Sequence, residues 1–213
     1  MNRKTISRSH VVWLLVPGIL TLSCGITPLS TKEVDLGRHV PRETIPLSVG
    51  LRIDDSVKNF CMQKSPLRDE MCVRGNTLTA LIEQASANTF KERTLVSGKE
   101  TPDALSAMSI DAVVSVKLIA VGGSDIEVSM RPVPFGHAME AYVILRWDIA
   151  SLDGRPVYFC QVRGQGQNTV HWGLGAVEDR RQTYIIALRD HFQKAQKEIV
   201  SSGWWKDSSW RQR

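Results

Sequence analysis

An Asp-Gly pair, Asp153-Gly154, separates two runs rich in β-branched and aromatic residues, and this arrangement constrains the fold more than any other local feature. The runs cover residues 140–150 and 155–165. Asp-Gly between two such runs is a strong signal for a β-hairpin, because its backbone suits the tight turn that joins paired strands. The chain is therefore expected to build a sheet around an antiparallel pair of strands.

Periodic patterns predict the elements around this hairpin. Residues 45–53 alternate apolar and polar side chains, which predicts a strand with one buried face. Apolar residues spaced by three and four predict a helix over 77–92, behind Asn76 as N-cap, and a long helix over 176–201. The other predicted elements are a strand at 94–97, a helix opened by Thr101-Pro102-Asp103, a hairpin of 110–121 and 126–130 around Gly122-Gly123, and a glycine-rich loop over 164–175.

This order of elements predicts the fold class. Strand, helix, short strand and short helix are followed by four antiparallel strands and a final helix. Such an order gives an α+β fold, an α/β sandwich with a largely antiparallel or mixed sheet and helices packed on one face. We expect a single domain over residues 45–201, followed by a tail over 202–213.

The first 23 residues have the pattern of a secretory leader. Arg3, Lys4 and Arg8 precede an apolar stretch, and the leader contains no acidic residue. The apolar stretch would rise only about 18 Å as a helix, against a hydrocarbon core of roughly 30 Å. The leader is therefore expected to be removed, and not to remain as a membrane span.

The end of the leader, Thr21-Leu22-Ser23-Cys24, resembles the lipobox of bacterial lipoproteins, with Thr21 where leucine is usual. The resemblance implies that Cys24 becomes the acylated N-terminus, carrying palmitate-type chains. The residues that follow, up to Thr44, contain turn formers and mixed charge without periodicity, which predicts a flexible tether over 24–44. Gly25 in place of aspartate implies the periplasmic face of the outer membrane. The alternative is an ordinary secreted protein cut nearby, with Cys24 left as a thiol.

Charge gives little support for nucleic-acid binding. The formal charge of +5 falls to +2 without the leader, which contains three of the 27 Lys and Arg residues and no acid. No basic stripe with interleaved aromatic residues is present in the sequence, so a nucleic-acid partner is not expected.

The remaining cysteines suggest a disulfide and a free thiol. In an oxidising compartment, Cys61 and Cys72 are the natural pair, because a short polar loop with a Ser65-Pro66 turn joins them. Cys160 lies in an apolar strand pattern, where it is either an inert buried thiol or a reactive one. No spacing of Cys, His or acidic residues indicates a metal site, and no cofactor motif is recognised.

The sequence contains no recognisable catalytic constellation, so we expect a protein that is not an enzyme. The alternative is an unrecognised site in which Cys160 and His171 act as nucleophile and base near the 164–175 loop. His191 is expected to be an ordinary histidine on the surface of the last helix.

The C-terminal tail concentrates tryptophan and basic residues. Tryptophan and arginine suit both membrane interfaces and protein-binding hot spots. The alternative is that Trp204 and Trp205 fold back onto the sheet while the rest of the tail is disordered. The candidate contact residues are Trp204, Trp205, Trp210 and Arg211.

Three stretches, IPLSVGLRIDD, GNTLTALIEQASANTF and SIDAVVSVKL, resemble the domain shared by the curli-secretion lipoprotein, penicillin-binding-protein activators and the N-terminal part of the Tol propeller protein. The resemblance implies an accessory lipoprotein that binds an envelope component in transport, secretion or cell-wall assembly. A structural subunit of an envelope oligomer is a further alternative.

Overall fold

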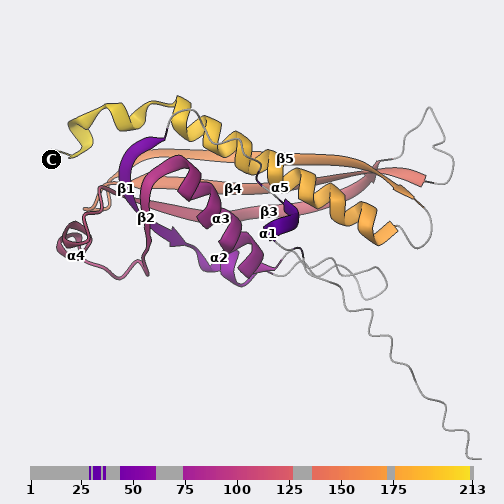
Figure 1. Cartoon of the computed structure of the whole chain (residues 1–213), viewed down its shortest axis with the longest axis horizontal. Helices are drawn as coiled ribbons and strands as arrows, with labels where there is room; N and C mark the ends of the chain where they lie inside the picture. The colour runs from indigo at the N-terminus through magenta and orange to yellow at the C-terminus, as the bar shows by residue number, and fades with distance from the viewer. Residues whose placement is uncertain are drawn as a thin grey trace, which may run out of the picture.

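A computed structural model of the chain describes residues 29, 31–34, 36, 44–60, 74–126, 136–171 and 176–211. The fold is a five-stranded mixed sheet with helices, in the order β2-β1-β3-β4-β5 (Figure 1). The predicted α+β class is therefore confirmed. Cys24, Cys61 and Cys72 lie outside the described residues, so lipidation and the disulfide remain predictions.

Parallel and antiparallel pairs meet at β3. Strand β1 (Ile45–Ile53) lies parallel to β2 (Phe90–Leu95) and to β3 (Ala112–Ile126). Strands β4 (Gly136–Ala150) and β5 (Pro156–His171) then continue the sheet in antiparallel register. The mixed sheet follows from the connections, because helical crossovers join the first three strands while the Asp-Gly turn joins β4 to β5.

Two long helices cover one face of the sheet. Helix α3 (Gly75–Thr89) and helix α5 (Ala176–Ser201) pack against each other, and α5 also packs on β4 and β5. The main core consists of side chains from these helices and of the inward-facing side chains of the strands. Among the described residues no helix has the length and hydropathy needed to cross a membrane.

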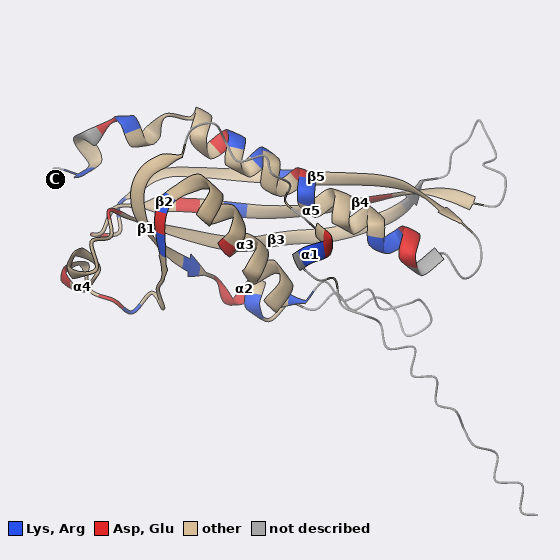
Figure 2. Cartoon of the chain, viewed as in Figure 1, with Lys and Arg blue, Asp and Glu red and all other residues tan. Residues whose placement is uncertain are grey.

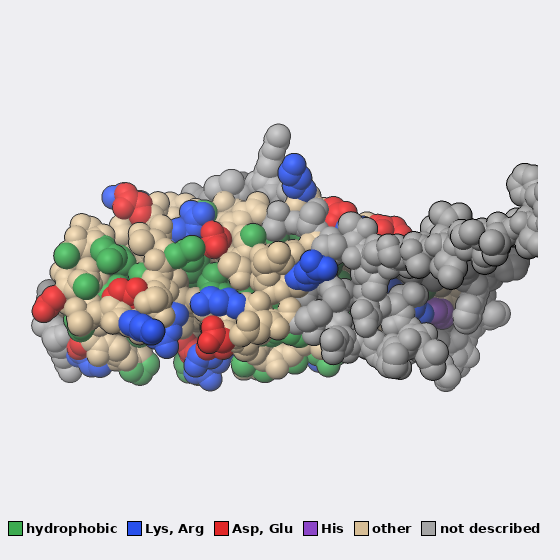
Figure 3. All heavy atoms as spheres, turned by 90° about the horizontal axis from the view of Figure 1, so that it is seen from below, with side chains coloured by type: hydrophobic (Ala, Val, Ile, Leu, Met, Phe, Trp, Pro, Cys, Tyr) green, Lys and Arg blue, Asp and Glu red, His purple; other side chains and the backbone are tan. Residues whose placement is uncertain are grey.

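The short helices lie around this two-layer core. Helix α2 (Asp55–Lys58) follows β1, and helix α1 (Thr31–Val34) lies against α5 and α3. Helix α4 (Pro102–Ala107) is capped by Thr101, whose hydroxyl accepts a hydrogen bond from the Ala104 N–H. The tail forms two 3-10 turns, η1 (Trp204–Lys206) and η2 (Ser208–Arg211). Viewed from below, hydrophobic side chains alternate with charges of both signs (Figure 3).

A second, smaller core lies on the other face of β1. It contains Val96, Leu105 of α4 and Ile110. Gly50 borders this cluster, since a Cβ there would lie 3.3 Å from Val96 Cγ1, whereas its neighbours Val49 and Leu51 belong to the main core. Helix α4 therefore covers one end of the face that the long helices leave open.

The predicted turn at Gly122-Gly123 is wrong. Both glycines lie inside β3, which pairs with β4 through to Ile126. A Cβ at Gly122 would lie 2.5 Å from the Tyr142 hydroxyl, and one at Gly123 would lie 2.8 Å from the Tyr184 hydroxyl. The glycines thus make room for two tyrosines, and three long antiparallel strands replace the four that were expected.

The predicted flexible tether over 24–44 is wrong in the part that the structure describes. Leu29, Val34 and Leu36 are buried in the main core. The predicted strand at 94–97 is also shifted, because α3 ends at Thr89 and β2 begins at once with Phe90, the buried residue of that strand. Strand β2 is otherwise exposed, so its sequence carries no alternation that would mark it.

Candidate functional site

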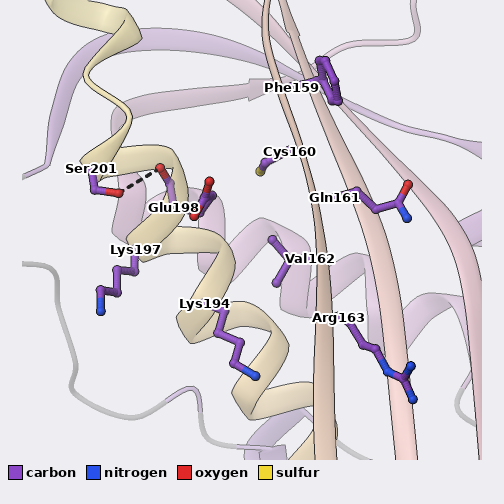
Figure 4. Close-up of a pocket in the computed structure, with 9 residues that line it drawn as sticks. All are labelled: Phe159, Cys160, Gln161, Val162, Arg163, Lys194, Lys197, Glu198 and Ser201. Carbon is purple, nitrogen blue, oxygen red and sulfur yellow. Dashed lines mark hydrogen bonds between the residues drawn. The ribbon is translucent and has the colours of Figure 1, made fainter.

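A groove of about 690 Å³ opens along β5, the outermost strand beside β4 (Figure 4). Five consecutive β5 residues, 159–163, form one wall, and the C-terminal half of α5 forms the other. Cys160 and Val162 point toward the helix, whereas Phe159, Gln161 and Arg163 point to the opposite face of the sheet (Figure 4). The lining residues from α5 are Lys194, Lys197, Glu198 and Ser201.

The groove exists because α5 touches β5 closely at one half only. A Cβ at Gly164 would lie 2.2 Å from the Ala187 carbonyl oxygen, and one at Gly166 would lie 2.2 Å from the Thr183 carbonyl oxygen. The two backbones are therefore nearly in contact there. Farther along α5 the strand presents Val162 and Cys160, which hold the helix away from it. The predicted loop over 164–175 is thus wrong for 164–171, which belong to β5.

Charges of both signs line the groove, and two of the basic side chains pair with acidic neighbours. Lys194 Nζ lies 2.6 Å from an Asp190 carboxylate oxygen, and an Arg163 guanidinium nitrogen lies 3.7 Å from Glu140. Basic and acidic side chains both occur along α5 (Figure 2). The groove does not have the strong field of one sign that a nucleic-acid surface would need.

The sheet face opposite the long helices carries aromatic rings covered by arginines. Arg146 lies over the Phe159 ring at 4.8 Å, and Arg163 lies over the Tyr142 ring at 4.6 Å. Phe159 is nevertheless 62% exposed. Sequence reasoning missed these residues, although the charged and aromatic side chains at alternate positions of 159–163 are a signal of an exposed strand face.

Cys160 is a buried free thiol on the side of β5 that faces α5 (Figure 4). Burial raises its pKa to about 11, with a smaller contribution from the Glu198 charge. Burial likewise raises the pKa of the neighbouring Tyr158 to about 12. Of the two alternatives for Cys160, a buried thiol and a reactive one, the structure supports the buried thiol.

We expect this thiol to resist alkylation. A soluble chain that begins after Cys24 and carries Cys61→Ser and Cys72→Ser leaves Cys160 as its thiol. At pH 8 a pKa of about 11 gives a thiolate fraction of about one in a thousand, against about one in ten at the ordinary value of 9.0. Iodoacetamide should therefore label the folded chain about 100-fold more slowly than the urea-unfolded chain, measured by mass. Equal rates in the two states would contradict the burial of this thiol.

The pairing of Cys160 with His171 as nucleophile and base is wrong. Both residues belong to β5, eleven positions apart, which places them roughly 36 Å from each other along an extended strand. His171 instead binds the Asp179 carboxylate through its ring Nδ1 at 2.9 Å and through its backbone N–H at 2.9 Å. His171 thus fastens the end of β5 to the first turn of α5.

His191 is buried in the core, contrary to the expectation of a surface residue. Its exposed fraction is 0%. The Trp147 indole N–H donates to His191 Nε2 at 3.4 Å, so Nδ1 carries the proton and donates to the Val162 carbonyl at 3.1 Å. This neutral histidine links α5 to β4 and β5.

The tail is folded back onto the domain. Trp204 is 9% exposed, and its ring centroid lies 5.7 Å from that of Trp210. Lys206 lies over the Trp205 ring and Arg211 over the Trp210 ring, each at 5.0 Å. The fold-back of Trp204 and Trp205 is therefore confirmed, whereas the expected disorder of the following residues is wrong for 208–211, which form η2. A contact of Trp205, Trp210 and Arg211 with a partner or membrane stays a prediction.

Within the described part of the chain, no cluster of three or more His, Cys, Asp or Glu residues could hold a metal ion. Those residues therefore provide no basis for assigning metal chemistry to the groove.

Comparisons with solved structures find bacterial proteins, several of which are named as lipoproteins. The chain aligns with a proposed homologue of a neuraminyllactose-binding hemagglutinin from Helicobacter pylori at 9% identity, over 78% of this chain and 92% of the other, with a TM-score of 0.49. It aligns with a minor lipoprotein from Acinetobacter baumannii at 9% identity, over 75% and 95%, with a TM-score of 0.43. It also aligns with rare lipoprotein B from Shewanella oneidensis at 14% identity, over 73% and 92%, with a TM-score of 0.35.

No protein-family model and no curated protein matches the sequence. TM-scores below 0.5 and such low identities do not place the chain in a family. The chain is similar in structure to bacterial lipoproteins, and its function has to be argued from its own residues.

Proposed function

We propose that this chain is a lipid-anchored accessory protein of the bacterial envelope that binds another envelope component and is not an enzyme. Acyl chains on Cys24 would hold it at the periplasmic face of the outer membrane. The leader and the lipobox-like Thr21-Leu22-Ser23-Cys24 support the anchor. Anchoring two proteins to one surface raises the local concentration of each, so a weak contact is sufficient.

The observation that carries the binding role is the open groove beside β5. Five successive residues of this outermost strand line it, and no strand of the described chain pairs with the outer side of β5. Such an edge is a common place for another chain to bind. The thiol in the groove is held in its neutral form, which favours binding over nucleophilic chemistry at this site.

The anchor is tested by metabolic labelling with a palmitate analogue. We expect label on the wild-type chain and none on Cys24→Ser, with the variant released from the membrane fraction. An unlabelled wild-type chain whose mature N-terminus lies elsewhere would overturn the lipoprotein proposal.

The groove is tested by photo-cross-linking in cells. A cross-linkable residue at Glu198, an exposed residue that lines the groove from α5, should capture an envelope component. The yield should fall at least severalfold in the Cys24→Ser background because the local concentration is lost. The matched control is the same residue at Arg93, an exposed position of β2 at the other edge of the sheet. Equal capture at both positions would contradict a specific role of the groove. Capture of a second copy of this chain would instead support the oligomer alternative.

A further inference from the structure

The segment just after the proposed anchor is docked on the helical layer. Three of its side chains, Leu29, Val34 and Leu36, are 4%, 0% and 2% exposed and belong to the main core. Helix α1, within this segment, lies beside α5 (Figure 1). We refer to the described residues between 29 and 36 as the clamp segment.

Polar contacts tie the clamp segment to both long helices. The Thr77 hydroxyl of α3 donates to the Leu29 carbonyl at 2.7 Å, and Arg189 Nε of α5 donates to the Val34 carbonyl at 3.2 Å. Glu33 forms an ion pair with Arg181, a side chain that is only 15% exposed. Buried apolar groups and satisfied carbonyls together oppose the entropy of a free chain.

Docking changes how far the domain can stand from an anchor at Cys24. Leu29 is five positions after Cys24, so even a fully extended chain spans only about 17 Å between them. With the clamp segment released, the chain from Cys24 to Thr44, which are twenty positions apart, could span roughly 70 Å. The contacts of a few side chains thus decide between a short and a long tether.

We propose that the clamp segment holds the domain against the bilayer, with the surface around Leu29, where α3 begins and α1 meets α5, facing the lipid. This inference rests on the proposed function, because it places the anchor at Cys24. The groove lies farther along α5: Lys197 is sixteen residues beyond Arg181, or about 24 Å of helix. The docked clamp segment therefore keeps the groove at a limited distance from the membrane, where partners on the same membrane meet it.

The test measures height above a membrane and does not depend on natural lipidation. The mature chain carries a hexahistidine tag in place of Cys24 and is bound to vesicles of phosphatidylcholine with a nickel-chelating lipid and a headgroup-labelled acceptor. A donor fluorophore is placed by a non-natural amino acid at Gln182, an exposed residue of α5. Energy transfer to the acceptor reports the distance of α5 from the bilayer.

Three variants distinguish the outcomes. Val34→Asp with Leu36→Asp releases the clamp segment and should lower the transfer efficiency at least twofold, while Lys32→Asp, an exposed change in the same segment, should leave it unchanged. A ten-residue Gly-Ser insertion after the tag lengthens the tether without touching the domain and should also lower transfer. If the insertion lowers transfer and the released variant, folded by circular dichroism, does not, the clamp proposal is overturned. Absent palmitate labelling would overturn only the natural anchor, since the tagged assay supplies its own.

Discussion

Replacing Gly164 with alanine is expected to lower the free energy of unfolding by about 3 kcal/mol, because a Cβ there meets backbone that cannot move alone. The added atom would lie 2.2 Å from the Ala187 carbonyl oxygen and 2.4 Å from His191 Cβ. To relieve these contacts α5 would have to shift away from β5 along its best-packed stretch. Urea unfolding followed by circular dichroism measures the change.

Gly50→Ala is the matched control for this prediction. Gly50 also lies in a buried part of the sheet, but its added Cβ would meet only side-chain atoms, those of Val96 at 3.3 Å and Ile110 at 3.4 Å, and no backbone. Alanine is also favoured over glycine in a strand by roughly 0.5–1 kcal/mol. We therefore expect a change within about 1 kcal/mol for Gly50→Ala. Similar losses for both variants would contradict the close contact between α5 and β5.

Elements defined by local chemistry could be predicted from the sequence. The predicted turn at Asp153-Gly154 is present, because Gly154 takes a positive φ of 84°, which glycine adopts without strain. The predicted start of α4 is also correct, because the Thr101 hydroxyl caps the first turn of the helix. The β1 alternation is also local, because a strand places successive side chains on opposite faces of the sheet.

Features that depend on distant partners could not be predicted in the same way. Gly122 and Gly164 read as turn or loop glycines, because nothing near them in the sequence shows that a tyrosine ring or a helix backbone needs their space. Leu29 and Val34 lie in a stretch without periodicity, so the sequence pattern could not predict that they are buried against the helices. His191 did carry a signal, since it stands three residues after the buried Leu188 and four before the buried Ala195.

Burial of that histidine predicts a specific loss of stability in mild acid. Desolvation lowers the pKa of His191 to about 4, although the Val162 carbonyl and the Asp190 charge act in the opposite direction. Above pH 6.5 the ring is neutral in both the folded and the unfolded chain and pH has no effect through it. Between pH 6.5 and about 4 the unfolded chain binds a proton that the folded chain does not, so stability falls as pH falls, by about 3 kcal/mol over the window.

The variant His191→Leu separates this effect from acid unfolding in general. We expect this substitution to lower the free energy of unfolding by about 2 kcal/mol at pH 7.5, because the Trp147 N–H and the Val162 carbonyl lose a buried partner. Between pH 6.5 and 4 its stability should vary less steeply than that of the wild type. Carboxylates with lowered pKa values, such as Asp54 and Asp179, lose their contribution only as the pH falls below the ordinary value of 3.8, so their window lies at lower pH. Urea unfolding at a series of pH values measures the free energy of unfolding of both chains. If its slope against pH between 6.5 and 4 is the same in His191→Leu as in the wild type, another group binds the proton. The neutral histidine between α5 and the sheet would then not set the acid sensitivity of this fold.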